Sequence, residues 1–287
     1  MAKIIDGKKI SADIRAELRR ETEELTRQGC RPGLAVVIVG EDAASKIYVR
    51  NKKRACEEVG IYSEEYDLPA ETTQDELIAL VRTLNQSPKL DGILVQLPLP
   101  RQISDKAVIA AISPEKDVDC FTAENVGRVS IGEYTLAPCT PAGCIELLER
   151  SRIEIKGKRC VVLGRSNIVG KPMAMLLLER HGTVTVCHSR TVDLPGICRE
   201  ADILVSAIGK AKFVTAEMVK QGAVVLDVGM NRDEQGKLCG DVDFEPVAAK
   251  ASAITPVPGG VGPMTITMLL KNTVASARKR LDTANLL

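Results

Sequence analysis

The sequence predicts an α/β fold with two domains. The chain has 287 residues, which is enough for about two domains. Short apolar runs, of the kind found in parallel strands buried on both faces, alternate with stretches whose apolar residues recur at helical spacing. Two of these runs, residues 203–208 and 223–228, end at a glycine. Open α/β sheets bind ligands at such strand ends.

The first half of the chain alternates strands and helices. Strands are expected at residues 34–39, 61–68 and 92–97, and helices at residues 10–25, 43–59, 75–85 and 105–112. This order favours parallel strands joined by helices. Residues 113–138 contain two prolines and two glycines and are expected to be irregular.

Residues 158–190 predict one strand, turn, helix and strand in the second half. Gly164 ends the first strand, Pro172 suits a first helical turn, and Gly182 stops the helix. A helix at 141–150 precedes this segment, strands follow at 203–208 and 223–228, and the last helix spans 264–280. The expected domains are residues 1–139, joined by the C-terminal residues 264–287, and residues 140–263, which form a Rossmann-like domain.

The turn after residue 163 is a candidate phosphate site. A strand–turn–helix of this kind places a phosphate against the N–H groups that open the helix. The two glycines, Gly164 and Gly170, have five residues between them, so the spacing differs from the G-x-G-x-x-G fingerprint. On the pattern alone, a tight turn without a ligand is the alternative.

The residues near the expected ribose position favour NADP over NAD. Chains that bind NAD place Asp or Glu at the end of the second strand, against the ribose 2′-hydroxyl. Here that strand ends in His188, Ser189 and Arg190, and Arg165 lies in the turn. Two arginines and a hydroxyl suit a 2′-phosphate. For Arg190 alone, a solvated surface charge is the alternative.

Composition and charge argue against several other classes of function. The net charge of +1 gives no support for nucleic acid or a membrane as partner, and two histidines do not favour a metal site. Nine cysteines, none of them spaced C-x-x-C, indicate reduced thiols of a cytoplasmic protein. The first residues lack a signal-peptide core, and no apolar stretch reaches membrane-spanning length.

Five polar residues in the first half are candidates for chemistry. Tyr48 and Lys52 are four residues apart on one expected helix and share a face, although such a pair is commonly solvated. Gln96 lies near the carboxyl end of an apolar strand, as either a satisfied core amide or a site residue. Asp117 and Asp119 follow a helix, where an acidic pair is commonly a cap or a solvent charge.

These features coincide with a known pattern. The matching stretches are Y-V-R-N-K (48–52), D-G-I-L-V-Q-L-P-L-P (91–100), P-E-K-D-V-D (114–119), C-T-P-A-G (139–143), G-R-S-N-I-V-G-K-P (164–172), D-V-G (227–229) and P-G-G-V-G-P-M-T (258–265). Together they resemble the bifunctional methylenetetrahydrofolate dehydrogenase/cyclohydrolase family along essentially the whole chain.

The resemblance implies a role for each candidate on the folate side. Lys52 would be the catalytic group, with Gln96 tuning it. Tyr48 would stack on the aminobenzoyl part of folate, and Asp119 would anchor the pterin. The remaining residues of the implied folate site are Val95, Leu97, Pro258, Gly259, Gly260, Val261 and Gly262.

The resemblance also implies the cofactor contacts. NADP would bind Gly164, Arg165, Ser166 and Ser189, and it would meet the backbone of Met230. The family is homodimeric and cytosolic, and it supplies one-carbon units for purine and amino-acid biosynthesis.

The sequence therefore predicts a two-domain α/β enzyme with a cleft between its domains. It would oxidise 5,10-methylenetetrahydrofolate with NADP and hydrolyse the methenyl product to 10-formyltetrahydrofolate. Two alternatives remain: another NADP-dependent dehydrogenase, acting on a hydroxy acid such as shikimate, and a non-enzymatic module that senses NADP.

Overall fold

The computed structural model describes residues 2–286, apart from the side chains of residues 43–45, 47 and 48. It divides into two compact units. Unit 1 comprises Met1–Ala12 and Thr140–Thr265, and unit 2 comprises Asp13–Cys139 and Ile266–Leu287. Three helices contain residues of both units: α1 (Gly7–Arg27), α6 (Cys139–Arg150) and α10 (Val261–Ala284). Among residues 2–286, no helix is long and apolar enough to cross a membrane.

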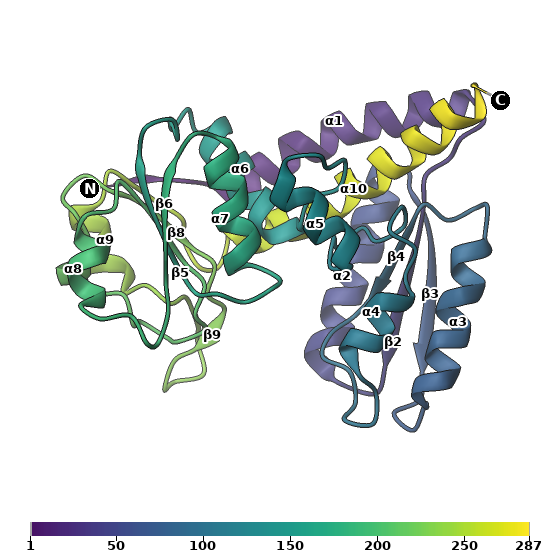
Figure 1. The fold of residues 1–287 in the computed structure, drawn as a ribbon, viewed down its shortest axis with the longest axis horizontal. Helices are drawn as coiled ribbons and strands as arrows, with labels where there is room; N and C mark the ends of the chain where they lie inside the picture. The colour runs from purple at the N-terminus through teal and green to yellow at the C-terminus, as the bar shows by residue number, and fades with distance from the viewer. Residues whose placement is uncertain (1, 287) are drawn as a thin grey trace. The chain divides into compact units, whose positions relative to one another are not determined.

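Unit 1 is built on an open parallel sheet (Figure 1). In the part of the chain that the structure describes, its six strands lie in the order β1-β11-β8-β7-β5-β6. They are β1 (Lys3–Ile4), β5 (Arg159–Leu163), β6 (Thr183–Cys187), β7 (Ile203–Ser206), β8 (Val224–Asp227) and β11 (Ala253–Ile254). β6 pairs on one side of β5 and β7 on the other, so the strand order reverses there. Sheets of this type bind ligands at the carboxyl ends of the strands beside such a reversal.

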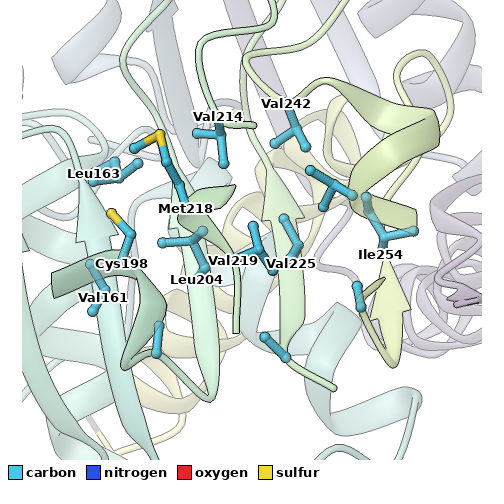
Figure 2. Packing of buried hydrophobic residues seen from close by; sticks show 14 of the residues in the cluster. Val161, Leu163, Cys198, Leu204, Val214, Met218, Val219, Val225, Val242 and Ile254 are labelled. Carbon is cyan, nitrogen blue, oxygen red and sulfur yellow. The ribbon is translucent and has the colours of Figure 1, made fainter. Parts of the chain in front are cut away.

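Helices cover both faces of this sheet, with α6 and α7 (Gly170–Glu179) on one side and α8 (Leu194–Arg199) and α9 (Phe244–Lys250) on the other (Figure 1). Figure 2 shows Leu204, Val225 and Ile254 from neighbouring strands in one apolar cluster with Met218 of the short helix η1 (Ala216–Met218). A hairpin of β9 (Asn231–Arg232) and β10 (Leu238–Cys239) follows β8. The apolar core thus fixes the strands whose ends form the ligand edge.

Unit 2 has a smaller parallel sheet, in which β2 (Gly33–Val39) lies between β3 (Tyr62–Leu68) and β4 (Gly92–Val95). Its further helices are α2 (Ala43–Val59), α3 (Gln74–Gln86), α4 (Asp105–Ala111) and α5 (Ala123–Ile131). β2 and β4 are buried at every residue, as strands covered on both faces must be. α3 begins with a capping box of Thr73 and Glu76 and packs Leu77 and Val81 on the sheet.

The predicted alternation of parallel strands and helices is confirmed in both units, but the N-terminus differs from expectation. The expected first domain began at residue 1, whereas residues up to Ala12 group with unit 1. The reason is β1, which pairs in parallel with β11 through Lys3 and Ala253. A two-residue strand is too short to give a periodic pattern in the sequence.

The expectation of irregular structure over residues 113–138 is wrong at α5. Thr122 caps this helix by accepting a hydrogen bond from the N–H of Asn125, and Gly132 ends it with a φ of 77°. Gly127 lies in mid-helix, where a Cβ would meet open space. Its presence hides a nine-residue helix from pattern analysis, because glycine commonly marks a break.

Candidate active site

Lys52 lies on α2 and is almost entirely buried, with 9% of its surface exposed. Its Nζ donates a hydrogen bond to Oε1 of Gln96 at 2.8 Å. The buried residues Val49, Ala55 and Cys56 anchor the same helix in the core of unit 2. Because Gln96 directly follows β4, the bond holds the Lys52 ammonium group at the carboxyl edge of the unit 2 sheet.

Two further hydrogen bonds, one from the backbone and one from the side chain, fix the position of Gln96. Its backbone N–H donates to the carbonyl of Val37 at 2.8 Å, and its Nε2 donates to the carbonyl of Leu97 at 2.7 Å. Since the amide nitrogen is used in this way, Oε1 is the atom turned toward Lys52. Val95 is buried and Leu97 is half-buried on either side of this amide. The structure therefore brings Lys52 and Gln96 together, as a site residue at this strand end requires.

Asp117 and Asp119 lie on a segment that runs beside β4, but they have different environments. Asp117 forms a parallel bridge with Ile93, and its buried carboxylate accepts the backbone N–H groups of Phe121 and Thr122 at 3.1 and 2.8 Å. It is a capping residue for the turn before α5. Asp119 is half-buried and makes no such cap in the described bonds, so it is the acid of the pair that is left for a ligand.

Lys52 and Asp119 act on each other electrostatically. Burial lowers the pKa of Lys52 from its ordinary value of 10.5, and the charge of Asp119 opposes that shift. Burial raises the pKa of Asp119 from 3.8 to about 6, and the Lys52 ammonium group opposes that shift in turn. A lysine with a lowered pKa exchanges a proton more readily. A half-buried carboxylate can accept hydrogen bonds from the N–H groups of a ligand.

In unit 1, the turn after β5 depends on glycine. Gly164 has a φ of +117°, and a Cβ there would overlap the carbonyl oxygen of Ala207. A Cβ at Gly170 would overlap the backbone of Gly164 in the same way. The two glycines therefore let this turn pack closely against the residue that follows β7 and against the start of α7.

The first N–H groups of α7 are used within the chain, contrary to the expected phosphate contact. Oγ of Ser166 accepts from the N–H groups of Val169 and Gly170 at 3.1 and 3.2 Å, and its carbonyl accepts from Lys171 at 3.1 Å. Two side chains of this turn, those of Arg165 and Ser166, are exposed. The glycine turn and an exposed guanidinium fit a phosphorylated dinucleotide.

The end of β6 lies beside this turn. Leu163 pairs with Cys187, so the segments that follow β5 and β6 leave the sheet at the same level. Nδ1 of His188 accepts the N–H of Arg190 at 3.1 Å, and both Ser189 and Arg190 are exposed. The structure thus brings the predicted 2′-phosphate residues to one corner of unit 1.

The remaining predicted residues of unit 1 lie on the loop after β8 and on the segment that leads into α10. Met230 follows β8 and is 51% exposed. The glycine-rich segment at residues 258–262 leads into α10 and packs against the first turn of α1, because the N–H of Lys8 donates to the carbonyl of Gly259 at 3.1 Å. A Cβ at Gly7 would overlap the carbonyl oxygen of Gly260. Residue 7, at the start of α1, must therefore be glycine for the two segments to approach this closely.

Two family models match the chain. The catalytic domain of the tetrahydrofolate dehydrogenase/cyclohydrolase model matches residues 5–119, and its NAD(P)-binding domain matches residues 138–281. The chain belongs to the tetrahydrofolate dehydrogenase/cyclohydrolase family.

Relatives of known name or structure are similar to this chain over nearly their whole length. The bifunctional protein FolD of Moorella thermoacetica is 62% identical over 278 residues, which cover 97% of this chain and 99% of the relative. The crystal structure of FolD from Campylobacter jejuni has a TM-score of 0.96 at 49% identity and covers 98% of this chain and 100% of that one. FolD of Trypanosoma brucei, solved with NADP cofactor and an inhibitor, has a TM-score of 0.92 at 44% identity, covering 97% and 98%.

Membership of the tetrahydrofolate dehydrogenase/cyclohydrolase family confirms the predicted family, the enzyme class and a nicotinamide cofactor. This membership favours a folate dehydrogenase/cyclohydrolase over the two alternatives, a hydroxy-acid dehydrogenase and a non-enzymatic NADP sensor. The roles predicted for single residues stay predictions. Tyr48 lies four residues before Lys52 on α2, but its side chain is outside the described part of the structure.

Two polar residues beside Asp119, Asn272 and Cys139, were given no role from the sequence. Asn272 on α10 is buried, and its Nδ2 donates to the carbonyls of Val118 and Ala137, both at 2.8 Å. Sγ of Cys139 lies 3.3 Å from the carbonyl of Val118 and 3.7 Å from Oδ1 of Asp119. The only signal in the sequence is an asparagine inside an apolar stretch of the last helix, and such residues are commonly surface positions.

Proposed function

We propose that the chain oxidises 5,10-methylenetetrahydrofolate with NADP and hydrolyses the methenyl product to 10-formyltetrahydrofolate. One observation carries the proposal: a buried lysine, Lys52, is hydrogen-bonded to Gln96 at a strand end where Asp119 acts on the same ammonium group. This arrangement lies within residues 5–119, the part that matches the family's catalytic domain.

In this proposal the hydrolysis depends on proton transfer at Nζ of Lys52. Water adds to the methenyl carbon and gives one proton to Lys52; the bond from that carbon to N5 then breaks as N5 receives this proton, and the remaining hydroxyl proton leaves to solvent as the 10-formyl group forms. Lys52 accepts and returns the proton, and Oε1 of Gln96 holds Nζ in place. Asp119 accepts hydrogen bonds from the pterin amino and ring N–H groups. Tyr48 stacks on the aminobenzoyl group, and the segment at residues 258–262 supports the folate.

Oxidation needs orientation more than acid–base help. NADP, when bound, supplies the acceptor for the hydride. On this proposal Arg165 and Ser189 bind its 2′-phosphate, while Ser166 and the backbone of Met230 bind elsewhere on the cofactor. The exposed positions of Arg165 and Ser189 support this assignment, as does the NADP complex of the Trypanosoma brucei relative.

The test mixes the protein with 5,10-methylenetetrahydrofolate and NADP and follows NADPH and the methenyl absorbance together. The proposal expects NADPH to form and the methenyl intermediate to decay faster than it does without protein. Shikimate with NADP is the control and should give no NADPH. NADPH from shikimate, or none from the folate, would contradict the proposal.

Folate binding should weaken as the pH falls below about 6. Asp119 accepts hydrogen bonds from the pterin as a carboxylate, and that form is lost as the pH falls through its pKa of about 6. The KM for the folate should therefore rise about tenfold for each unit below pH 6. Steady-state kinetics from pH 7.5 to 4.5 would measure this. The Asp119→Asn variant should have a high KM with no such rise, and a flat wild-type profile would contradict the role of Asp119.

We also propose that the protein is a cytoplasmic homodimer that uses unit 1 for assembly. Support comes from β6, which is an edge strand of the described sheet, and from apolar side chains on or beside it: Val186, Leu178 and Val192 are 38%, 55% and 86% exposed. Exposed strand edges and apolar side chains favour pairing. The nine cysteines are free thiols, which supports a reducing compartment.

Light scattering at micromolar concentration should give twice the mass of the chain, and the Val186→Lys variant should shift the protein toward a monomer. A charge in a buried interface is costly unless it is paired. Lys replacement of the exposed Ile131 in unit 2 is the control and should leave the dimer intact. A monomeric wild-type protein would contradict the proposal.

A further inference from the structure

A buried carboxylate, that of Asp241, lies at the carboxyl ends of two strands in unit 1. Asp241 has no exposed surface and follows the hairpin strand β10. Its Oδ2 accepts hydrogen bonds from Oγ of Ser206, at the end of β7, and from the N–H groups of Ile208 and Gly209. These three distances are 3.1, 2.8 and 3.3 Å. One oxygen thus shapes the loop that leaves β7.

The other carboxylate oxygen of Asp241, Oδ1, hydrogen-bonds both to the loop that leaves β7 and to the loop that leaves β8. Oδ1 of Asp241 accepts from the N–H of Lys210 and from Nδ2 of Asn231, both at 2.9 Å. Asn231 directly follows Met230, whose backbone is a proposed cofactor contact. The single carboxylate therefore fixes residues 207–210 and residues 228–231 relative to each other.

A second buried carboxylate holds Asp241 itself. Oδ1 of Asp227, the last residue of β8, accepts from the N–H groups of Gly229 and Asp241, and its Oδ2 accepts from Val242, all at 2.9 Å. A Cβ at Gly229 would overlap the Asp241 carboxylate, and one at Gly240 would overlap that of Asp227. The space beside both acids is available only because these two positions are glycine.

Stability alone does not account for this arrangement. The five donors to Asp241 are neutral groups, namely three backbone N–H groups, a hydroxyl and an amide. Burying a carboxylate is costly unless such donors replace its water, and apolar side chains of similar size often stabilise a core equally well. A carboxylate with five converging donors does what an apolar side chain cannot, which is to set the backbone path of two loops.

We propose that Asp241 is a positioning residue for the dehydrogenase reaction, through the two loops that it holds at the cofactor edge of unit 1. The inference rests on the proposed binding of NADP at that edge. It assigns Asp241 no part in the hydrolysis, because the proposed proton-transfer group, Lys52, belongs to unit 2 and hydrolysis uses no NADP. The two activities of one chain therefore act as internal controls for each other.

The test is the Asp241→Asn variant, which puts an NH2 group among N–H donors while keeping the side-chain size. NADP binding is measured by calorimetric titration without folate, and hydrolysis of added methenyltetrahydrofolate is measured without NADP. We expect the Kd and KM for NADP to rise about tenfold, as the loss of a hydrogen bond to a charged group implies. The KM for the folate and the rate of hydrolysis should stay within about twofold of wild type.

Asp202→Asn is the matched control. Asp202 accepts the N–H of Arg159 at 2.9 Å and Nζ of Lys220 at 2.6 Å, at the amino end of the same sheet. This variant should leave NADP binding unchanged. If Asp241→Asn does not fold, Asn231→Ala, which removes one donor to Oδ1, should still raise the Kd for NADP and spare hydrolysis.

Normal NADP binding by a folded Asp241→Asn or Asn231→Ala protein would overturn the inference, and so would an equal loss of both activities. The wild-type protein in the same titration separates the two proposals. If it binds NADP but does not turn over folate, the proposed function fails while the effect on the Kd still tests Asp241. If it does not bind NADP, both proposals fail.

Discussion

The Lys52→Met variant should lose hydrolysis of methenyltetrahydrofolate by about a hundred- to ten-thousandfold, the usual contribution of a positioned acid or base. Methionine keeps much of the length of the side chain and removes its proton-transfer group. Dehydrogenase activity should fall less, because hydride transfer depends chiefly on orientation. NADP binding should be unchanged, since the predicted cofactor residues all belong to unit 1.

The neighbouring lysine provides the control. Lys53 lies on the same helix, but its side chain is 50% exposed and pairs with Glu65 at 3.2 Å. Lys53→Met should therefore leave hydrolysis near the wild-type rate. The assay is the decay of the methenyl absorbance, corrected for the uncatalysed rate, with circular dichroism to show that each variant is folded. Near-normal hydrolysis by folded Lys52→Met would refute the role of Lys52 and direct attention to a water held by Gln96 and Asp119.

The Arg165→Ala variant should weaken NADP binding by about ten- to a hundredfold and leave the affinity for NAD nearly unchanged. A charge-assisted hydrogen bond contributes about 1.5–3 kcal/mol, which corresponds to that range of affinity. Arg165 is exposed in the turn after β5, beside the segment that carries Ser189. The 2′-phosphate is absent from NAD, so the loss should be selective.

Arg159→Ala is the matched control, because Arg159 lies at the opposite end of β5 and pairs with Glu200 at 2.8 Å. It should not change the Kd of either cofactor. Titration of both variants with NADP and with NAD gives the ratio of affinities. Equal weakening of NADP and NAD by Arg165→Ala would argue against the 2′-phosphate contact.

The parallel core strands could be predicted from the sequence because their signal is local. β2, β4, β7 and β8 are apolar at nearly every residue, as strands buried on both faces must be. Two other elements gave no such signal. β1 is a strand only because β11 pairs with it, and α5 is short with a glycine at its centre.

The residues of the candidate site also differ in whether the sequence could predict them. Lys52 and Gln96 could be proposed because they interrupt recognisable helix and strand patterns, and the structure joins them by a hydrogen bond. Asp241 and Asn272 could not be, because an Asp after a glycine or an Asn on a helix has many ordinary roles. Their importance follows from hydrogen bonds to residues distant in the sequence: Asn272 donates to the carbonyl of Val118, for example.

The central claim is that Lys52 works as a proton-transfer group because burial lowers its pKa. The most direct test is an NMR titration of the protein labelled with ¹³C at the lysine side chains, with the Lys52→Met spectrum identifying the Lys52 signal. The account predicts a midpoint below 10.5, the ordinary value for lysine, and a pH profile for hydrolysis that follows the same midpoint. A Lys52 signal that titrates at or above 10.5 would contradict it.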